Sequence, residues 1–362
     1  MPSSPRSASP LASDQPAAPF ARPRATVLGA FIEGWRRVLG APALTASMVL
    51  ATLLLALPLA IALGGMLEEH LGASGEAELA AEGWHAGWAA EFGAQAQGLG
   101  RTFTHEILGF GGTLATLSGL LDRAPLNPVL AGAAAAYVVL WIFVSGGLLD
   151  RLARARPVGV AAFFSACGAY FVRFLRLGVP IGAAYWALFA FLHPYLFGTL
   201  YSRFTRDMTE ERDAIVLRAA LYAAFLVPVA LVSLIADFAK VRAVVEDRRS
   251  MASALLTAVR FVRRRLLRVA GLYLLNIVAA LIVLRLWLQV APAAGAPVWI
   301  AFLIGQLYLL VRIWAKLAFM ASEVAFFQGE LAHARYTAAP LPQWPASAAA
   351  EAINNLSVER RS

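Results

Sequence analysis

The stretch PALTASMVLATLLLALPLAIALGG (42–65) decides the fold class of this chain. It contains no charged residue, and a helix formed from it would be apolar on every face. About 20 apolar residues in a helix cross about 30 Å of hydrocarbon. Five further stretches have a similar length and character: Asn127–Leu149, Leu177–Leu200, Val216–Phe238, Val269–Val290 and Val298–Ser322. We therefore expect an all-α, polytopic membrane helix bundle with six transmembrane helices.

The composition supports one membrane domain. Hydrophobic residues make up 60% of the 362 residues and charged residues 15%, whereas soluble domains carry about 25% charged residues. Residues 1–25 are rich in Pro, Ser and Ala, which predicts a disordered lead. We expect the membrane domain to cover residues 26–330 and a tail to cover 331–362. The single cysteine, Cys167, excludes an intramolecular disulfide.

The distribution of basic residues predicts the orientation. Lys and Arg number 22 on the side that holds the amino end, the 150–176 and 239–268 connections and the tail, but only 5 on the opposite side. Cytoplasmic loops carry this kind of excess. We expect both termini to be cytoplasmic and the protein to lie in a bacterial inner membrane. Because topology accounts for the basic residues, the net charge of +9 requires no nucleic-acid partner.

Three segments that mix aromatic residues with arginines precede the first, third and fifth spans. They are AFIEGWRRVLGAPAL (30–44), GAYFVRFLRLGVP (168–180) and AVRFVRRRLLRVAGL (258–272). This pattern is typical of amphipathic helices that lie in the headgroup plane, with arginines beside lipid phosphates. We therefore expect membrane lipids as partners, including anionic headgroups at the cytoplasmic arginines. The protein partners stay unknown.

The outer connection, 66–126, is too long for a simple turn. Trp84, Trp88 and Phe92 share a helical face, which predicts a helix on the membrane surface, and ILGFGGTLATLSGLL (107–121) predicts a second interfacial or re-entrant helix. Histidines and glutamates are scattered through this connection without the spacing of a metal motif. We expect no metal and no cofactor.

The most distinctive stretch is ADFAKVRAVVEDRRSMASALLTAVRFVRRRLLRVAGLYLL (236–275). It resembles the corresponding connections of uncharacterised bacterial multi-spanning proteins of the inner membrane and of the membrane domain attached to some glycerophosphodiester phosphodiesterases. The resemblance covers about forty residues and implies a membrane-domain fold. No catalytic phosphodiesterase domain accompanies it, so it implies no enzymatic activity. Residues 246–249 (EDRR) predict a salt-bridged cytoplasmic turn.

Charged residues inside the spans are the functional candidates, because each costs at least a few kcal/mol unless it finds a partner or reaches water. Arg312 and Lys316 lie four residues apart on one face of the sixth span. We expect Arg312 to pair with an acid. The candidate intramembrane polar cluster contains Arg312, Lys316, Asp237, Glu323 and Gln306. A structural ion pair, a path for substrate or protons, and a site for an anionic lipid headgroup are the alternatives.

No nucleotide-binding, hydrolase or dehydrogenase motif occurs. We therefore expect a protein without catalytic activity, acting as a scaffold, an assembly factor or an organiser of lipid. The alternative is a small-solute transporter or channel that uses polar residues of the fourth and sixth spans. Mid-span Pro58 and Pro228 favour that alternative. His193 beside Pro194 fits either a proton gate in a transporter or an interfacial anchor formed with Tyr195.

Overall fold

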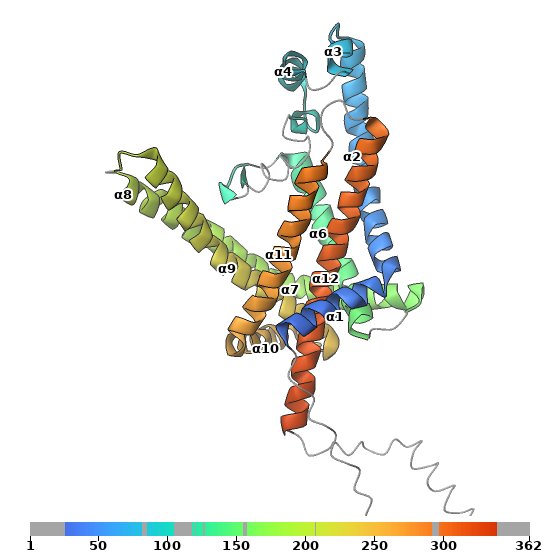
Figure 1. Cartoon of the computed structure of the whole chain (residues 1–362), viewed down its shortest axis with the longest axis vertical. Helices are drawn as coiled ribbons and strands as arrows, with labels where there is room; N and C mark the ends of the chain where they lie inside the picture. The colour runs from blue at the N-terminus through green and yellow to red at the C-terminus, as the bar shows by residue number, and fades with distance from the viewer. Residues whose placement is uncertain are drawn as a thin grey trace, which may run out of the picture. The chain divides into compact units, whose positions relative to one another are not determined.

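A computed structural model describes residues 26–81, 85–104, 118–119, 121–125, 127–154, 158–206, 208–291 and 297–338. These residues form helices and no strand. Figure 1 labels most of them. The α-helices are α1 (Val27–Leu39), α2 (Pro42–Gly72), α3 (Ala77–Ala81), α4 (Ala86–Gln95), α6 (Pro128–Arg154), α7 (Val160–Ala187), α8 (Tyr201–Thr205), α9 (Glu211–Val245), α10 (Met251–Arg264), α11 (Leu266–Val290) and α12 (Val298–Ala338). The 3₁₀ helix η1 (Gly100–Thr102) and the π-helices η3 (Leu188–Leu192) and η4 (Tyr195–Leu200) complete the set.

The six predicted spans are confirmed as helices long and apolar enough to cross a membrane. Five of them are α2, α6, α9, α11 and α12, and the other is the continuous helical run of residues 160–205 from α7 to α8. The described part of the chain is therefore all-helical, and the protein is a multi-pass membrane protein. Its orientation in the membrane stays a prediction.

The third span differs from expectation. Residues 168–180 do not form a separate interfacial helix, because α7 continues from Val160 through Pro180 to Ala187. In the first of the three segments, residues 30–44, the helix does break, because Ala41, the residue before Pro42, leaves the helical region (φ −139°, ψ 55°). At Pro180 the helix continues, which membrane helices tolerate. Among the described residues, a separate short helix thus precedes the span in the first and third of these segments, as α1 and α10, and not in the second.

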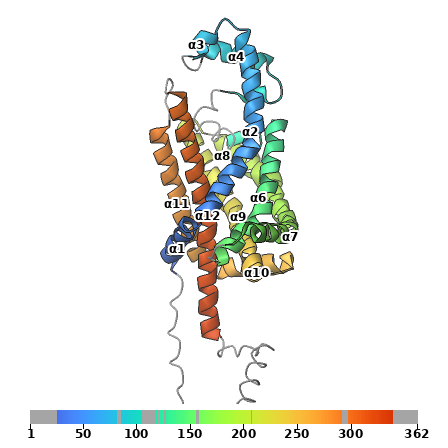
Figure 2. The same cartoon turned by 90° about the vertical axis from the view of Figure 1, so that its right-hand side faces the viewer.

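Helix α1 packs closely against α12. Thr26 caps its N-terminus by accepting a hydrogen bond from the Gly29 amide, and Gly34 and Val38 lie on its buried face. A Cβ at Gly34 would lie 2.5 Å from the Ser322 backbone nitrogen, so the absence of a side chain permits the contact. Figure 1 shows α1 crossing α12, and Figure 2 shows α1 beside α12 from another side.

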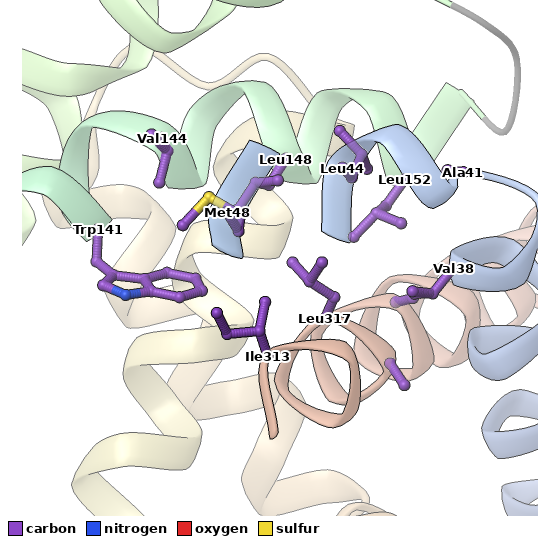
Figure 3. Close-up of a cluster of buried hydrophobic side chains, with 12 residues drawn as sticks. Val38, Ala41, Leu44, Met48, Trp141, Val144, Leu148, Leu152, Ile313 and Leu317 are labelled. Atoms are coloured by element: carbon purple, nitrogen blue, oxygen red, sulfur yellow. The ribbon is translucent and has the colours of Figure 1, made fainter. Parts of the chain in front are cut away.

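A core of buried apolar side chains joins the helices around α12. Figure 3 shows Trp141 and Leu148 of α6, Met48 of α2, and Ile313 and Leu317 of α12 facing one another. The full buried set is Val38, Ala41, Leu44, Met48, Trp141, Val144, Leu148, Leu152, Ile313, Leu317, Ala318 and Ala321. This core fixes the positions from which polar side chains extend.

Small residues bring α6 and α7 together. A Cβ at Gly146 would lie 2.7 Å from the Tyr170 Cβ, and one at Gly147 would lie 2.6 Å from the Cys167 sulfur. Cys167 is fully buried there. Small residues at helix contacts are how membrane helices gain van der Waals packing.

The outer connection contains α3, α4 and η1. Trp88 and Phe92 of α4 are buried against Leu67 and Leu71 of α2 and against Phe103, so this face of α4 packs on protein. Trp84 and residues 105–117 lie outside the described residues, and so does much of the second predicted helix of this connection.

Contacts divide the chain into two units. One unit is Thr26–Phe327, which contains five of the helical spans and α12 as far as residue 327. The other holds residues 1–25 and 328–362, of which the structure describes residues 328–338, the end of α12. The predicted lead, 1–25, and the tail from residue 339 lie outside the described residues.

Candidate functional site

The candidate cluster is built around one ion pair on α9. The Asp237 carboxylate lies 2.5 Å from the Lys240 ammonium, three residues later on the same helix. The Tyr273 hydroxyl of α11 donates a 2.8 Å hydrogen bond to the other carboxylate oxygen. Both members of the pair are only partly exposed, at 27% for Asp237 and 32% for Lys240. Asp237 therefore already has two partners, and neither is Arg312.

Glu323 of α12 is the most deeply buried acid near this pair, at 2% exposure. It interacts electrostatically with Asp237 and Lys240. Its Oε1 atom nevertheless lacks a hydrogen-bond partner among the described residues. A buried acceptor in this state costs about 1–3 kcal/mol.

Lys316 lies two turns before Glu323 on α12. Its ammonium is 3.4 Å from the centroid of a Trp141 ring and 5.7 Å from that of Tyr137. No carboxylate lies within ion-pair distance of it in the described part of the chain. The aromatic faces of α6 therefore hold this cation in place of an acid.

Arg312 makes neither an ion pair nor a hydrogen bond with any residue that the structure describes. The expected pairing with Asp237 or Glu323 is wrong, because Lys240 already neutralises Asp237 and Glu323 lies three turns further along α12. Instead, Arg312 lines an open groove of about 420 Å³ between α11 and α12. Its walls include Ile277, Leu281 and Leu284 of α11. This is a cation beside a largely aliphatic surface.

A second cavity, of about 350 Å³, lies between α6, α9 and α12. Four charged groups line it, three from the predicted cluster and one that pairs with Asp237, together with aromatic and small side chains of α6. The charged residues are Asp237, Lys240, Lys316 and Glu323, and the α6 residues include Tyr137, Trp141 and Ser145. Lys316 lines both this cavity and the groove.

Gln306 stands apart from the cluster. It is half-buried, lies nearer the start of α12 than Arg312, and lines neither cavity. Its Oε1 also lacks a partner in the described part of the chain. The structure thus brings together four of the five predicted cluster residues around two adjoining cavities and separates the fifth.

Sequence reasoning missed Lys240, Tyr273 and Trp141. Lys240 was assigned to the cytoplasmic connection, although its spacing of three residues from Asp237 is a signal for an ion pair on a helix. Tyr273 and Trp141 carry no such signal, because spacing within their own helices does not show which charged residues of other helices they contact.

Asn276 of α11 also escaped notice. It donates a 3.1 Å hydrogen bond to the Ser322 hydroxyl of α12 and lines the groove that contains Arg312. An asparagine in the interior of a membrane bundle joins helices in this way.

The other candidates have structural partners. His193 is buried, its Nε2 lies 2.5 Å from the Leu121 carbonyl oxygen, and its ring stacks near Phe189. Two π-helical segments flank Pro194, which cannot donate a backbone hydrogen bond. His70 accepts a hydrogen bond from the Trp88 indole. Within the described residues, no group of three metal-ligating side chains occurs.

The predicted salt-bridged turn after α9 is confirmed. Glu246 accepts hydrogen bonds from Arg242 at 2.9 Å and from Arg248 at 2.5 Å. Asp247, in a left-handed conformation (φ 44°), accepts one from Arg173 of α7 at 2.7 Å. That guanidinium holds the pKa of Asp247 below its usual value. The turn thus ties α9 to α7.

Comparisons with known proteins add no relative: no family model, curated protein or solved structure matches the chain. The resemblance of residues 236–275 to membrane domains of glycerophosphodiester phosphodiesterases stays a prediction. The chain is a multi-pass helical membrane protein with two adjoining cavities, each lined in part by charged side chains.

Proposed function

We propose that this chain is a non-catalytic integral protein of the bacterial inner membrane that binds and organises anionic lipid on the cytoplasmic side. One observation carries the proposal. Arg312 lines the groove between α11 and α12 without a carboxylate partner among the described residues, and the walls beside it are mostly aliphatic.

The chemistry of the groove matches a lipid with a phosphate group. An uncompensated arginine inside hydrocarbon costs about 2.5 kcal/mol or more. A phosphate offsets that cost through two parallel N–H···O bonds to the guanidinium. An acyl chain then lies along Ile277, Leu281 and Leu284, which line the same groove. Trp35 of α1 also lines the groove and packs edge-on against Trp314 at 4.7 Å between ring centroids.

The short amphipathic helices favour the same role. Arg36 of α1 is 80% exposed, while the opposite face of that helix is buried. Helix α10 has the same division, with buried Ala254 and Ala258 and exposed Arg263 and Arg264. Exposed arginines at a membrane surface contribute about 1 kcal/mol each to attraction of anionic lipid.

The test measures lipid binding by the full chain in neutral detergent. We expect native mass spectrometry to show tighter binding of phosphatidylglycerol than of phosphatidylcholine. Arg312→Gln should lower the affinity for phosphatidylglycerol about tenfold, which corresponds to about 1.4 kcal/mol of binding free energy. Arg285→Gln is the matched control, because Arg285 is also a span arginine but does not line the groove. Equal binding by the two variants would contradict the proposal.

A small-solute transporter is the second candidate, and a different observation favours it. Charged residues of α9 and α12 line the cavity against α6, and one of them, Glu323, is buried with an unpartnered oxygen. Buried ionisable groups in membrane helices mark solute and proton paths. Uptake of radiolabelled amino acids, sugars and inorganic ions into proteoliposomes tests this role. Uptake that Glu323→Gln abolishes would support it, and absence of uptake for every solute would count against it.

A further inference from the structure

The cavity between α6, α9 and α12 has the size of a small-molecule site. Its volume of about 350 Å³ is at the lower end of the range of about 300–1,000 Å³ for ligand pockets. Its walls combine aliphatic and aromatic side chains with a few charged groups. This composition is typical of sites that bind a small polar molecule in a fixed orientation.

Glu323 supplies an acceptor to this cavity. The residue is 2% exposed and its Oε1 has no hydrogen-bond partner in the described part of the chain. Lys240, which also lines the cavity, and Tyr273, which lies within hydrogen-bonding reach of Glu323, are both bonded to Asp237. A buried acceptor in a native structure requires a donor, so the cavity lacks a donor at this point.

Lys316 supplies the opposite charge. It lines the same cavity and has no carboxylate within ion-pair distance among the described residues. Trp141, whose ring lies against it, has a buried indole nitrogen that also lacks a partner. Lys316 and Glu323 are seven residues apart, so they lie on one face of α12 about 10 Å apart along its axis. The cavity therefore has an unpaired cation toward one end and an unpaired acceptor toward the other.

The charge balance narrows the ligand class. Two carboxylates and two ammonium groups line the cavity, so their formal charges cancel. A metal cation would meet two lysines, and a simple anion would leave Glu323 without a donor. A simple amine would leave Lys316 without an acceptor. A molecule with an ammonium and a carboxylate satisfies both ends at once.

We propose that this cavity binds a small zwitterionic solute of the amino-acid class, with its ammonium group at Glu323 and its carboxylate at Lys316 and the Trp141 indole. The Asp237–Lys240 ion pair also lines the cavity, and its two charges cancel. The proposal concerns this cavity and does not depend on lipid binding in the groove at Arg312.

The test uses the full chain in detergent and measures thermal unfolding and calorimetric binding. The probes are glycine, β-alanine, γ-aminobutyrate and ε-aminocaproate at about 10 mM, compared with butylamine and butyrate, which each carry one of the two charged groups. We expect at least one zwitterion to raise Tm by about 2 °C or more, because a ligand that binds only the folded state stabilises it. Neither single-charge probe should do so.

Variants locate the binding. We expect Glu323→Gln and Lys316→Gln each to lower the affinity for the zwitterion that binds most tightly by at least about tenfold. Glu68→Gln and Arg285→Gln are the controls, because both residues lie outside the cavity. The proposal is overturned if no zwitterion changes Tm, if butylamine or butyrate acts equally well, or if both cavity variants bind normally. The probe comparison uses wild-type protein, so it decides the matter even where a variant does not fold. Loss of phosphatidylglycerol binding in Arg312→Gln reports on the lipid role alone.

Discussion

Replacing Gly34 by alanine tests the contact that holds α1 on the bundle. The new Cβ would lie 2.5 Å from the Ser322 nitrogen and 2.7 Å from its Cα. Favourable carbon contacts require about 3.5–4.0 Å. Because the atoms that it meets are backbone atoms of α12, relief requires α1 to move away by about 1 Å.

The expected cost follows from three contributions. Overpacking of this kind costs about 1–3 kcal/mol, and movement of α1 weakens the contact between Trp35 and Trp314 by about 0.5–1.5 kcal/mol. Alanine in a helix regains up to about 1 kcal/mol relative to glycine. The net expectation is a loss of about 2 kcal/mol, which corresponds to a fall in Tm of about 4 °C for a protein of this size.

The assay uses the single cysteine as a reporter. Cys167 is fully buried between α6 and α7, so a fluorogenic thiol reagent reacts when the bundle opens. Gly305→Ala on α12 is the matched control, because nothing lies within 4 Å of a Cβ there. We expect the control to keep or raise Tm. If Gly34→Ala has a Tm equal to or above that of the wild type, the packing explanation fails.

Three further predictions concern charges and topology. Lys240→Met should lower the free energy of unfolding by about 2 kcal/mol, because it leaves Asp237 without its counter-ion. Adding Asp237→Asn should recover much of that loss when the thermal unfolding of the single and double variants is compared. Additive losses would contradict the pairing. Arg173 lowers the pKa of Asp247 below its ordinary value of 3.8. The bond between them therefore stabilises the fold above that pH, and this contribution is lost as the pH falls through the lower pKa of the folded state. Asp247→Asn should therefore make Tm depend less on pH below about pH 4. The free energy involved should be less than about 1 kcal/mol, since the carboxylate is 72% exposed. An unchanged dependence of Tm on pH would refute this prediction. Alkaline phosphatase fused after Ser362 should be inactive and a fusion within residues 75–100 active; the reverse pattern would refute the orientation.

The spans could be predicted because their signal is a property of length and composition. About 20 apolar residues are needed to cross the hydrocarbon whatever the neighbouring helices do, and all six stretches are helical. The start of the third span could not be found in this way. Arg173 and Arg176 indicated a surface segment, but in the structure Arg173 bonds to Asp247 while α7 continues past it. A tertiary partner, which local sequence does not reveal, decides this case.

The candidate site was predictable in part for a related reason. Helical spacing correctly placed Arg312 and Lys316 on one face of α12, since both line the same groove. The partner of Asp237 was missed because α9 extends to Val245, well beyond the apolar stretch that defined the span. Spacing within a helix is a local property, whereas the choice among ionic partners depends on how the helices pack.

The charges that line the two cavities predict a different occupant for each. Three basic residues and two acids contribute to it, which leaves one formal positive charge. The groups that line the cavity against α6 and α9 balance among themselves, so that cavity favours a neutral zwitterion over an ion. The remaining charge is Arg312, which lines only the groove between α11 and α12. We expect an anion with an apolar body at that position, since a small water-soluble anion would gain nothing from the aliphatic walls. The same balance therefore supports a lipid at Arg312 and a zwitterionic solute beside Glu323.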